Sequence, residues 1–250
     1  MSTSTRRVAP VNPATGGPDQ PPVRPLVTVQ RQVRSNDTRT ALIDAAEELF
    51  ASQGVEGPSL REINRAAGQR NTTALQYHFG DRKGLLIAVL QRHALDVANR
   101  RRALLDLWQQ GAERSLRGLV NALVLPLFSK LSDSDGGPNF LSIAAELMNR
   151  GVPAVPGEPA GVLVFDDLGT METWSRLVEP FVPEEGHDEP FHRRRLAIRL
   201  VFTELGRRAR TGQYGDAQPY ANHLVDIVGA LLSCPFSAET LGSLQRGPEL

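Results

Sequence analysis

The stretch that decides the fold runs from Ser59 to Phe79 and reads SLREINRAAGQRNTTALQYHF. Its first residue is a serine three positions before Glu62, which is the spacing of a capping box at the start of a helix. Gly68 then interrupts the helical pattern, as glycine commonly does at a helix end. Two short helices, expected at about 60–67 and 72–78, predict a helix-turn-helix motif.

The second of these helices has the polar outer face that a DNA-recognition helix needs. Such a helix must fit a major groove about 12 Å wide. Thr72 and Thr73 either contact bases or a thymine methyl group, or serve as helix-start residues. Asn71 either reads adenine through paired hydrogen bonds or caps the helix. Ala74 and Leu75 face inward and are expected to pack on the neighbouring helices.

We expect the chain to divide into an arm, a DNA-binding domain and a body. Residues 1–34 hold six prolines and no periodicity, which indicates a flexible arm. Residues 35–82 form the expected helix-turn-helix domain, with a first helix that begins near Asp37 and turns Glu47 to solvent. Residues 83–250 form the expected helical body.

Apolar residues recur at helical spacing along most of the body, and alternating strand patterns are nearly absent. The sequence therefore predicts an all-α fold. The expected helices of the body, after a long fourth helix that starts near Leu85, cover about 116–127, 139–150, 171–182, 191–210 and 220–232.

The composition excludes several classes of protein. A single Cys among 250 residues excludes an internal disulfide framework. No apolar run approaches the roughly 18 residues of a membrane span, and no apolar stretch follows Arg6 and Arg7 as in a secretory signal, so we expect a cytoplasmic protein. Residues 1–102 hold 15 basic and 9 acidic side chains, whereas residues 103–250 hold 13 and 19. A basic first part favours a polyanionic partner.

Motifs typical of enzymes are absent from the sequence. It has no phosphate-binding glycine loop, no HExxH and no GxSxG. His187 and His192 lie in an acidic stretch that we interpret as a surface loop, and no base is placed near Cys234. We expect no enzymatic activity, no cofactor and no metal. The alternative is a helical enzyme or small-molecule-binding protein whose helix-turn-helix is incidental.

An ordered set of short motifs resembles the TetR family of bacterial transcriptional regulators over about Thr38–Leu90. The motifs are Leu49-Phe50, Gly54-Val55, Ser59 to Ile63, Ala67-Gly68, Tyr77 to Phe79 and Leu85-Leu86. The resemblance implies an N-terminal three-helix unit that binds DNA, a ligand pocket in the C-terminal helices, and a dimer formed by the last two helices. The expected function is a ligand-responsive, homodimeric repressor of a palindromic operator.

The resemblance also implies roles for single residues. Arg61 occupies a position that the family often uses for a base or backbone contact, and His78 one that reaches a phosphate. Gln76 and Arg82 stand where the family usually has Tyr and Lys, and both can still donate to a phosphate. The full expected DNA-contact set is Ser59, Arg61, Asn71, Thr72, Thr73, Gln76, Tyr77, His78, Arg82 and Lys83.

Two further sets belong to the body. Large apolar residues there either line a pocket for an unidentified small-molecule effector or form plain core. These pocket candidates are Trp108, Phe128, Phe140, Met148, Met171 and Trp174. The resemblance implies a dimer interface on the last two helices, with Leu196, Leu200, Leu224, Ile227, Val228 and Leu231 as its candidates.

Overall fold

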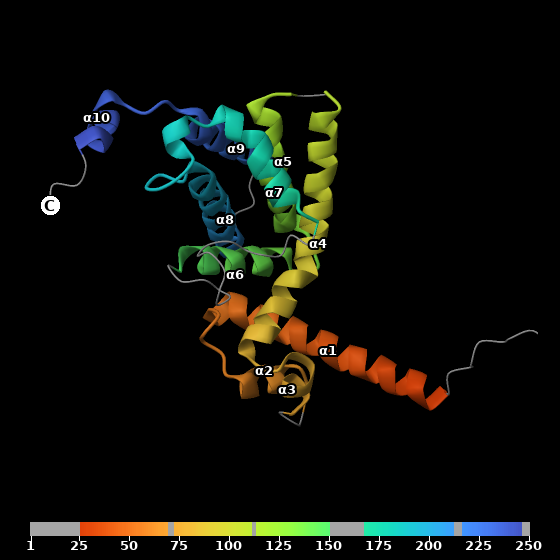
Figure 1. The fold of residues 1–250 in the computed structure, drawn as a ribbon. Coiled ribbons are helices and arrows are strands. Elements are labelled where there is room, and N and C mark those ends of the chain that lie inside the picture. The colour runs from red at the N-terminus through yellow and green to blue at the C-terminus, as the bar shows by residue number, and fades with distance from the viewer. Residues whose placement is uncertain (1–25, 70–72, 112–113, 151–167, 213–216, 247–250) are drawn as a thin grey trace, which may run out of the picture. The chain divides into compact units, whose positions relative to one another are not determined.

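The computed structural model describes residues 26–69, 73–111, 114–150, 168–212 and 217–246. Every regular element in these ranges is an α- or 3₁₀-helix, so the expected all-α fold is confirmed (Figure 1). The α-helices are α1 (Leu26–Gln53), α2 (Leu60–Ala66), α3 (Thr73–Phe79), α4 (Arg82–Gln109), α5 (Leu116–Ser129), α6 (Gly137–Asn149), α7 (Thr170–Val178), α8 (Arg193–Thr211), α9 (Ala217–Ser233) and α10 (Ala238–Arg246). Short 3₁₀ turns lie at Lys130–Ser132, Glu179–Phe181 and Glu184–Gly186.

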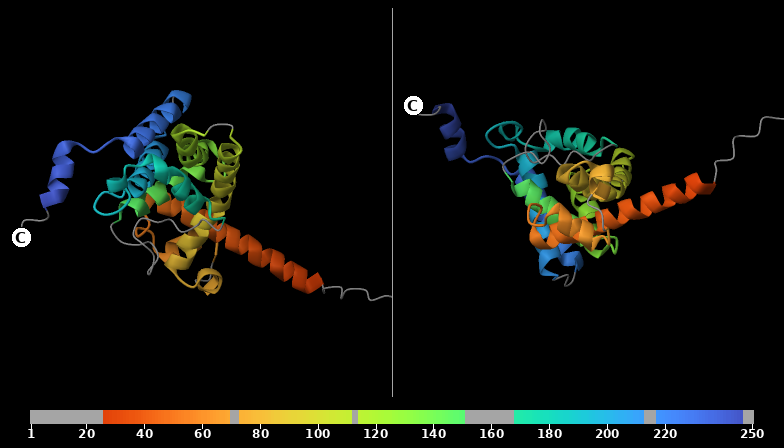
Figure 2. Two further views of the ribbon diagram at one scale, coloured as in Figure 1. Left: turned by 45° about the horizontal axis from the view of Figure 1, so that its top comes forward. Right: turned by 90° about the horizontal axis from the view of Figure 1, so that it is seen from below.

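The second half of α1 packs with α2, α3 and the start of α4, and we call this group the head (Figures 1 and 2). Its core consists of fully buried apolar side chains that come from all four helices. Phe50, Ile63, Leu75 and Leu85 are examples. The short helices α2 and α3 are held by this core because so few residues cannot form a stable helix alone.

The first helix is longer than the sequence suggested. We expected a start near Asp37, but α1 begins at Leu26, directly after Pro25. The physical reason is that residues 26–53 contain no proline or glycine to stop a helix. Residues 1–25 of the expected arm lie outside the described part of the chain, so the three-part division stays a prediction.

In the body, α5 packs against α4 and α9, while α6 packs along α8 (Figure 1). The helix expected over 171–182 ends at Val178, and Pro180 lies in the following 3₁₀ turn. The sequence reasoning missed α10 because its last apolar stripe ended at Leu232. The short alternating stretch at 162–165 lies outside the described residues.

Glu47 corrects one expectation. We expected it to face solvent, but its carboxylate is 3.2 Å from the Nε2 atom of the fully buried His93. The ring of His93 also stacks on Phe140, with 4.9 Å between centroids. The periodicity of α1 could not show this burial, because the partners of Glu47 come from α4 and from the body.

Lys130 is a second buried charged residue. The ammonium group of Lys130 is fully buried and lies 2.8 Å from Asp133 and 2.9 Å from Asp135. Paired carboxylates offset the cost of burying this cation. Burial alone would lower the pKa of Lys130, but the hydrogen bonds that its ammonium donates to Asp133 and Asp135 raise that pKa, so the ammonium stays charged.

No single helix among the described residues is long and apolar enough to cross a membrane. One pair, 218–233 with 238–244, passes that test together but is bent by 47°.

Candidate DNA-binding site

The start of α2 is fixed by the expected capping box. The Ser59 hydroxyl accepts a hydrogen bond from the Glu62 backbone N–H at 3.2 Å. In return, the Glu62 carboxylate accepts one from the Ser59 backbone N–H at 2.7 Å. These hydrogen bonds lower the pKa of Glu62 below its ordinary value of 4.5, the backbone bond of Ser59 contributing most. A charged Glu62 therefore stabilises the entry into the motif.

Helix α3 turns its polar face to solvent and its apolar face to the head. Leu75 is fully buried, and Ala74 packs on the same core from a partly buried position. Thr73, Gln76 and Tyr77 are exposed, and 82% of Tyr77 is accessible. A large aromatic residue this exposed on a short helix is available to a binding partner. Asn71 and Thr72 lie outside the described residues, and their roles stay predictions.

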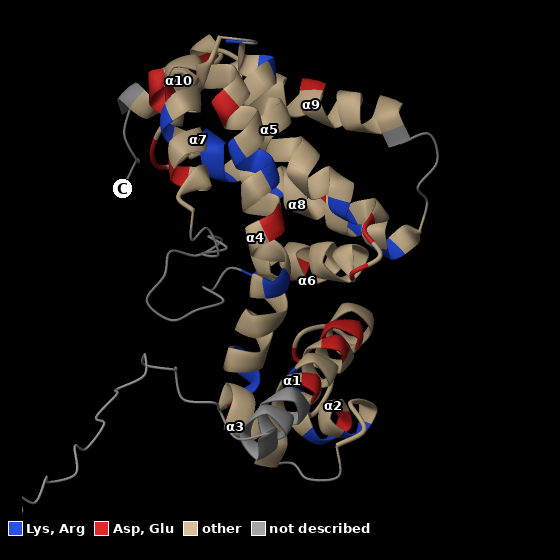
Figure 3. Cartoon of the chain, turned by 90° about the vertical axis from the view of Figure 1, so that its right-hand side faces the viewer, with Lys and Arg blue, Asp and Glu red and all other residues tan. Residues whose placement is uncertain are grey.

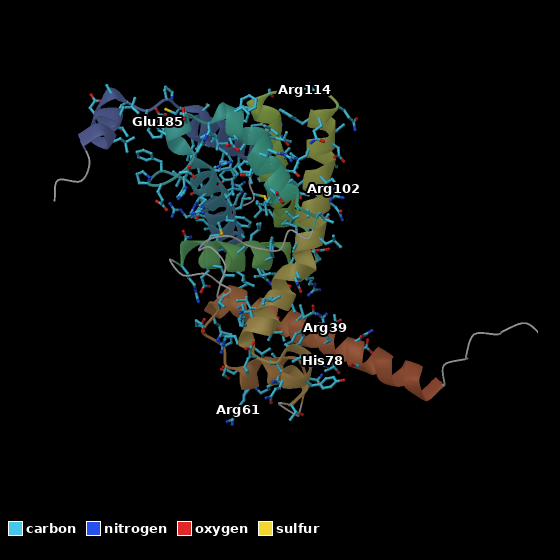
Figure 4. The ribbon with its side chains drawn as sticks, viewed as in Figure 1. Arg39, Arg61, His78, Arg102, Arg114 and Glu185 are labelled. Atoms are coloured by element: carbon cyan, nitrogen blue, oxygen red, sulfur yellow. The ribbon has the colours of Figure 1, made fainter. Side chains whose placement is uncertain are left out.

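A shallow hollow of about 340 Å³ separates the outer parts of α2 and α3. Arg61 and Gln76 line it from the two helices, together with the buried Asn64. Figure 4 shows the Arg61 side chain projecting from α2 away from the rest of the head. The hollow therefore presents a cation and an amide from two different helices to one partner.

Arg39 is a member of this surface that the sequence reasoning missed. Its guanidinium lies 5.4 Å from the centre of the Phe79 ring, and His78 lies beside it (Figure 4). Tyr77 meets His78 edge-on, with 5.1 Å between ring centroids. Burial lowers the pKa of His78 below its ordinary value of 6.5, and the charge of Arg39 lowers that pKa further. His78 is thus held neutral beside a permanent cation.

The two cations at the start of α4 differ. Arg82 donates to the carbonyl oxygen of Val55 at 2.9 Å, and its Nε atom lies 3.9 Å from the Glu56 carboxylate. It is therefore engaged within the head, and its expected phosphate contact stays a prediction. Lys83 is half-exposed at the next position. Figure 3 shows the Lys, Arg, Asp and Glu residues along the ribbon, with charges of both signs on the head and on the body.

All six pocket candidates pack in or against the core of the body. The indole N–H groups of Trp174 and Trp108 each donate to a backbone carbonyl at 2.9 Å. Neither the hollow described above nor a second one of about 320 Å³ between α1 and α4 contains any of the six. These positions are compatible with the alternative reading that the six residues are ordinary core. A ligand-binding role for them stays a prediction.

The six interface candidates separate into two groups. Leu224 and Val228 are buried within the chain, so they cannot be primary contacts with a second copy. Leu196 and Ile227 are 37% and 41% exposed. The remaining two, Leu200 and Leu231, are partly buried against the core. The apolar pattern of the sequence could not separate core positions from surface positions, because apolar residues occur at helical spacing in both.

A capped short helix followed by a second helix with an exposed polar face is the arrangement of a helix-turn-helix motif. Residues 42–89 match the family model described as bacterial regulatory proteins, tetR family. Over these residues, which run from the second half of α1 into α4, the chain is therefore similar to the TetR family of transcription regulators.

Similar solved structures extend over most of the chain. One is NalD of Pseudomonas aeruginosa, the secondary repressor of the MexAB-OprM multidrug efflux pump, which is 23% identical and covers 81% of this chain and 100% of its own, with a TM-score of 0.47. Another is the transcriptional regulator FadR of Bacillus subtilis, solved in complex with stearoyl-CoA, which is 16% identical and covers 79% of this chain and 99% of its own, with a TM-score of 0.48. A comparison with curated proteins finds no match.

Proposed function

We propose that the chain is a ligand-responsive transcription regulator that binds a palindromic operator as a homodimer and represses by occupying it. The observation that carries the proposal is the outer face of α3, where Thr73, Gln76 and Tyr77 are exposed while Leu75 anchors the helix. Side chains on such a face reach base edges in the major groove. In the alternative, an enzyme with an incidental helix pair, this face would be an ordinary solvated surface that selects no DNA sequence.

Phosphate contacts supply the sequence-independent part of the proposed affinity. Arg61 and Lys83 are accessible cations near α3, and Arg39 lies beside His78. Each neutralised phosphate releases counterions, so binding of this kind weakens as the salt concentration rises.

The proposed dimer places two heads on one duplex. The exposed Leu196 of α8 and Ile227 of α9 supply an apolar surface for a second copy. A two-fold axis through this surface presents two α3 helices to successive major grooves, about 34–36 Å apart. The two half-sites of the operator are then inverted copies of one sequence.

Selection from random duplexes by the purified chain tests the proposal. The expected result is enrichment of an inverted repeat that binds at least about 10³-fold more tightly than scrambled DNA of the same length. Gel shift over a salt series then gives the phosphate contribution. Selection of no sequence would contradict the proposal, as an enzyme or an architectural DNA-binding protein would give that result.

The effector part of the proposal has a separate test. Native mass spectrometry of the chain purified without denaturation should show a small molecule retained by the dimer. Adding that molecule to the selected duplex complex should weaken it, because an inducer must bind the non-DNA-binding conformation more tightly. Unchanged affinity in its presence would remove the ligand-responsive part and leave the DNA-binding part.

A further inference from the structure

The last turn of α6 binds the connection between α1 and α2, residues 54–57, which we call the head turn. Both carboxylate oxygens of Glu146 lie 3.2 Å from the backbone nitrogen of Val55, which donates to them. Arg150, one helical turn further on, donates to Glu146 and also to Glu56 at 3.1 Å. Glu146 lies in the last turn of α6, and Arg150 is the residue directly after the helix.

The other face of α6 is packed closely on α8. A Cβ atom added to Gly206 of α8 would lie 2.2 Å from the Cβ atom of Ala145 and 2.8 Å from the carbonyl oxygen of Leu141. The two helix backbones therefore approach as closely as a glycine permits. Helices packed this tightly shift together rather than slide separately.

These two contacts join the proposed dimer helix to the head. Leu196 of α8 lies on the surface proposed for the second copy, α8 fixes α6, and Glu146 of α6 fixes the head turn. The capping box of α2 does not involve Glu146, whereas the apolar core of the head is continuous with that of the body. Glu146 adds a hydrogen bond between the head turn and α6, beside the stacking of Phe140 on His93, and so bears on the direction in which the head leaves the body.

We propose that Glu146 is a positioning residue that fixes the separation of the two DNA-binding heads and thereby sets the half-site spacing that the dimer accepts. This inference rests on the proposed function, since it concerns a dimer on a two-half-site operator. The Val55 N–H bond is charge-assisted and directional, which suits a contact that defines an angle. Arg150 supports it by holding the Glu146 carboxylate and Glu56 together.

The expected effect is on the complete operator rather than on a single half-site. Once one head of a dimer is bound, the second head has a high effective concentration at the second half-site, and the dimer gains affinity. A head that is free to tilt loses part of this gain. It also tolerates spacings that the wild-type dimer rejects. Binding of one head to an isolated half-site uses side chains of that head alone and should be unaffected.

The experiment uses the full chain and the duplex selected by the wild-type protein. Fluorescence anisotropy measures Kd for the selected duplex, for versions with the spacing lengthened or shortened by one base pair, and for a duplex with one half-site. We expect E146A to raise Kd for the selected spacing about tenfold and to reduce the difference between spacings. Its Kd for the single half-site should change by less than about twofold.

Two variants make the result specific. E179A removes an acid that pairs with Arg194 of α8 at 3.2 Å and touches no part of the head, so it should keep the wild-type spacing preference. R150Q keeps Glu146 but removes the two ion pairs that Arg150 forms, one with Glu146 and one with Glu56. We expect it to give a weaker form of the E146A result. It also serves if E146A fails to fold.

Three results would overturn the inference. One is a spacing preference in E146A and R150Q that equals that of E179A. Another is an equal loss on the single half-site and on the complete operator, since Glu146 would then act within one head. If the wild-type chain selects no sequence at all, the proposed function fails first and the inference fails with it.

Discussion

At the scale of single residues, the ionisation of His78 depends on a side chain outside the helix-turn-helix motif. Arg39 lies in α1, far from His78 in the sequence, and no local pattern links the two residues. The motif alone could therefore predict a phosphate contact for His78 but not its charge. Since burial and Arg39 both lower the pKa of His78, the ring is neutral where its ordinary pKa would leave it partly charged.

We expect Arg39→Gln to raise the pKa of His78 toward 6.5, because one of the two causes of the shift is removed. NMR titration of the His78 ring protons measures this. Because the pKa of His78 is lower in the folded state, the neutral ring contributes its full stability above 6.5, and this contribution is lost as the pH falls below 6.5 through the lowered pKa of the folded state. The variant should therefore show a smaller loss of stability on acidification. An unchanged titration midpoint would contradict the role of Arg39.

The Ser59 cap gives a second prediction at this scale. Ser59→Ala removes the side-chain acceptor of the Glu62 N–H and should cost about 1 kcal/mol of unfolding free energy. The pKa of Glu62 should rise part of the way back to 4.5, since the backbone hydrogen bond from residue 59 remains. A carboxyl group with a lowered pKa stabilises above 4.5 and loses that contribution as the pH falls.

Urea unfolding of Ser59→Ala at neutral pH and at a pH below 4.5 measures both effects. We expect the gap between variant and wild type to be larger at neutral pH, because Glu62 is charged there. A constant gap at both pH values would show that the capping box contributes no electrostatic stabilisation.

At the scale of elements, local signals were predictable and contacts between distant segments were not. The capping box, the ends of α2 and α3 within a residue, and the inward Leu75 all follow from neighbours within one turn. The buried Glu47 and the paired Arg82 have partners from other segments of the chain. Periodicity therefore gave the wrong face for Glu47, and no local pattern indicated the hydrogen bond from Arg82 to Val55. The start of α1 was missed because proline content upstream outweighed the uninterrupted run after Pro25.

The turn before α6 gives a prediction that separates backbone strain from contact. Gly136 and Gly68 both have a positive φ, 96° and 68°. A Cβ atom at Gly68 would meet nothing within 4 Å, whereas one at Gly136 would lie 1.9 Å from an oxygen of the buried Glu47. Gly68→Ala should cost only the strain of a left-handed residue, about 1 kcal/mol. Gly136→Ala should cost about 3 kcal/mol or more, because it also displaces Glu47 from His93.

Chemical denaturation of both alanine variants gives the two free energies directly. The Gly68 variant is the control, since it carries the same substitution and the same sign of φ. Equal losses would mean that Glu47 moves aside without cost and that its buried contact with His93 contributes little.

At the scale of the whole molecule, the apolar residues of α8 and α9 lie in two environments, core and surface, that the apolar pattern of the sequence could not distinguish. Val228 is fully buried, whereas its neighbour Ile227 is 41% exposed. Leu196 of α8 is also exposed, at 37%. Adjacent positions on α9 therefore point to opposite environments, one toward the core of the chain and one toward solvent. Only the exposed position can contact a second copy.

This pair of neighbours tests the proposed dimer. Ile227→Asp should dissociate the dimer and leave each chain folded, because the side chain is already exposed and the charge stays in water once the copies separate. Val228→Asp should instead unfold the chain, because it buries an unpaired carboxylate. Sedimentation velocity gives the mass, and circular dichroism melting gives the fold. The monomeric Ile227 variant should bind the selected operator about 10²-fold more weakly, since its two heads are no longer linked. A dimer that survives Ile227→Asp would place the interface on another surface and would remove the basis for the two-fold operator.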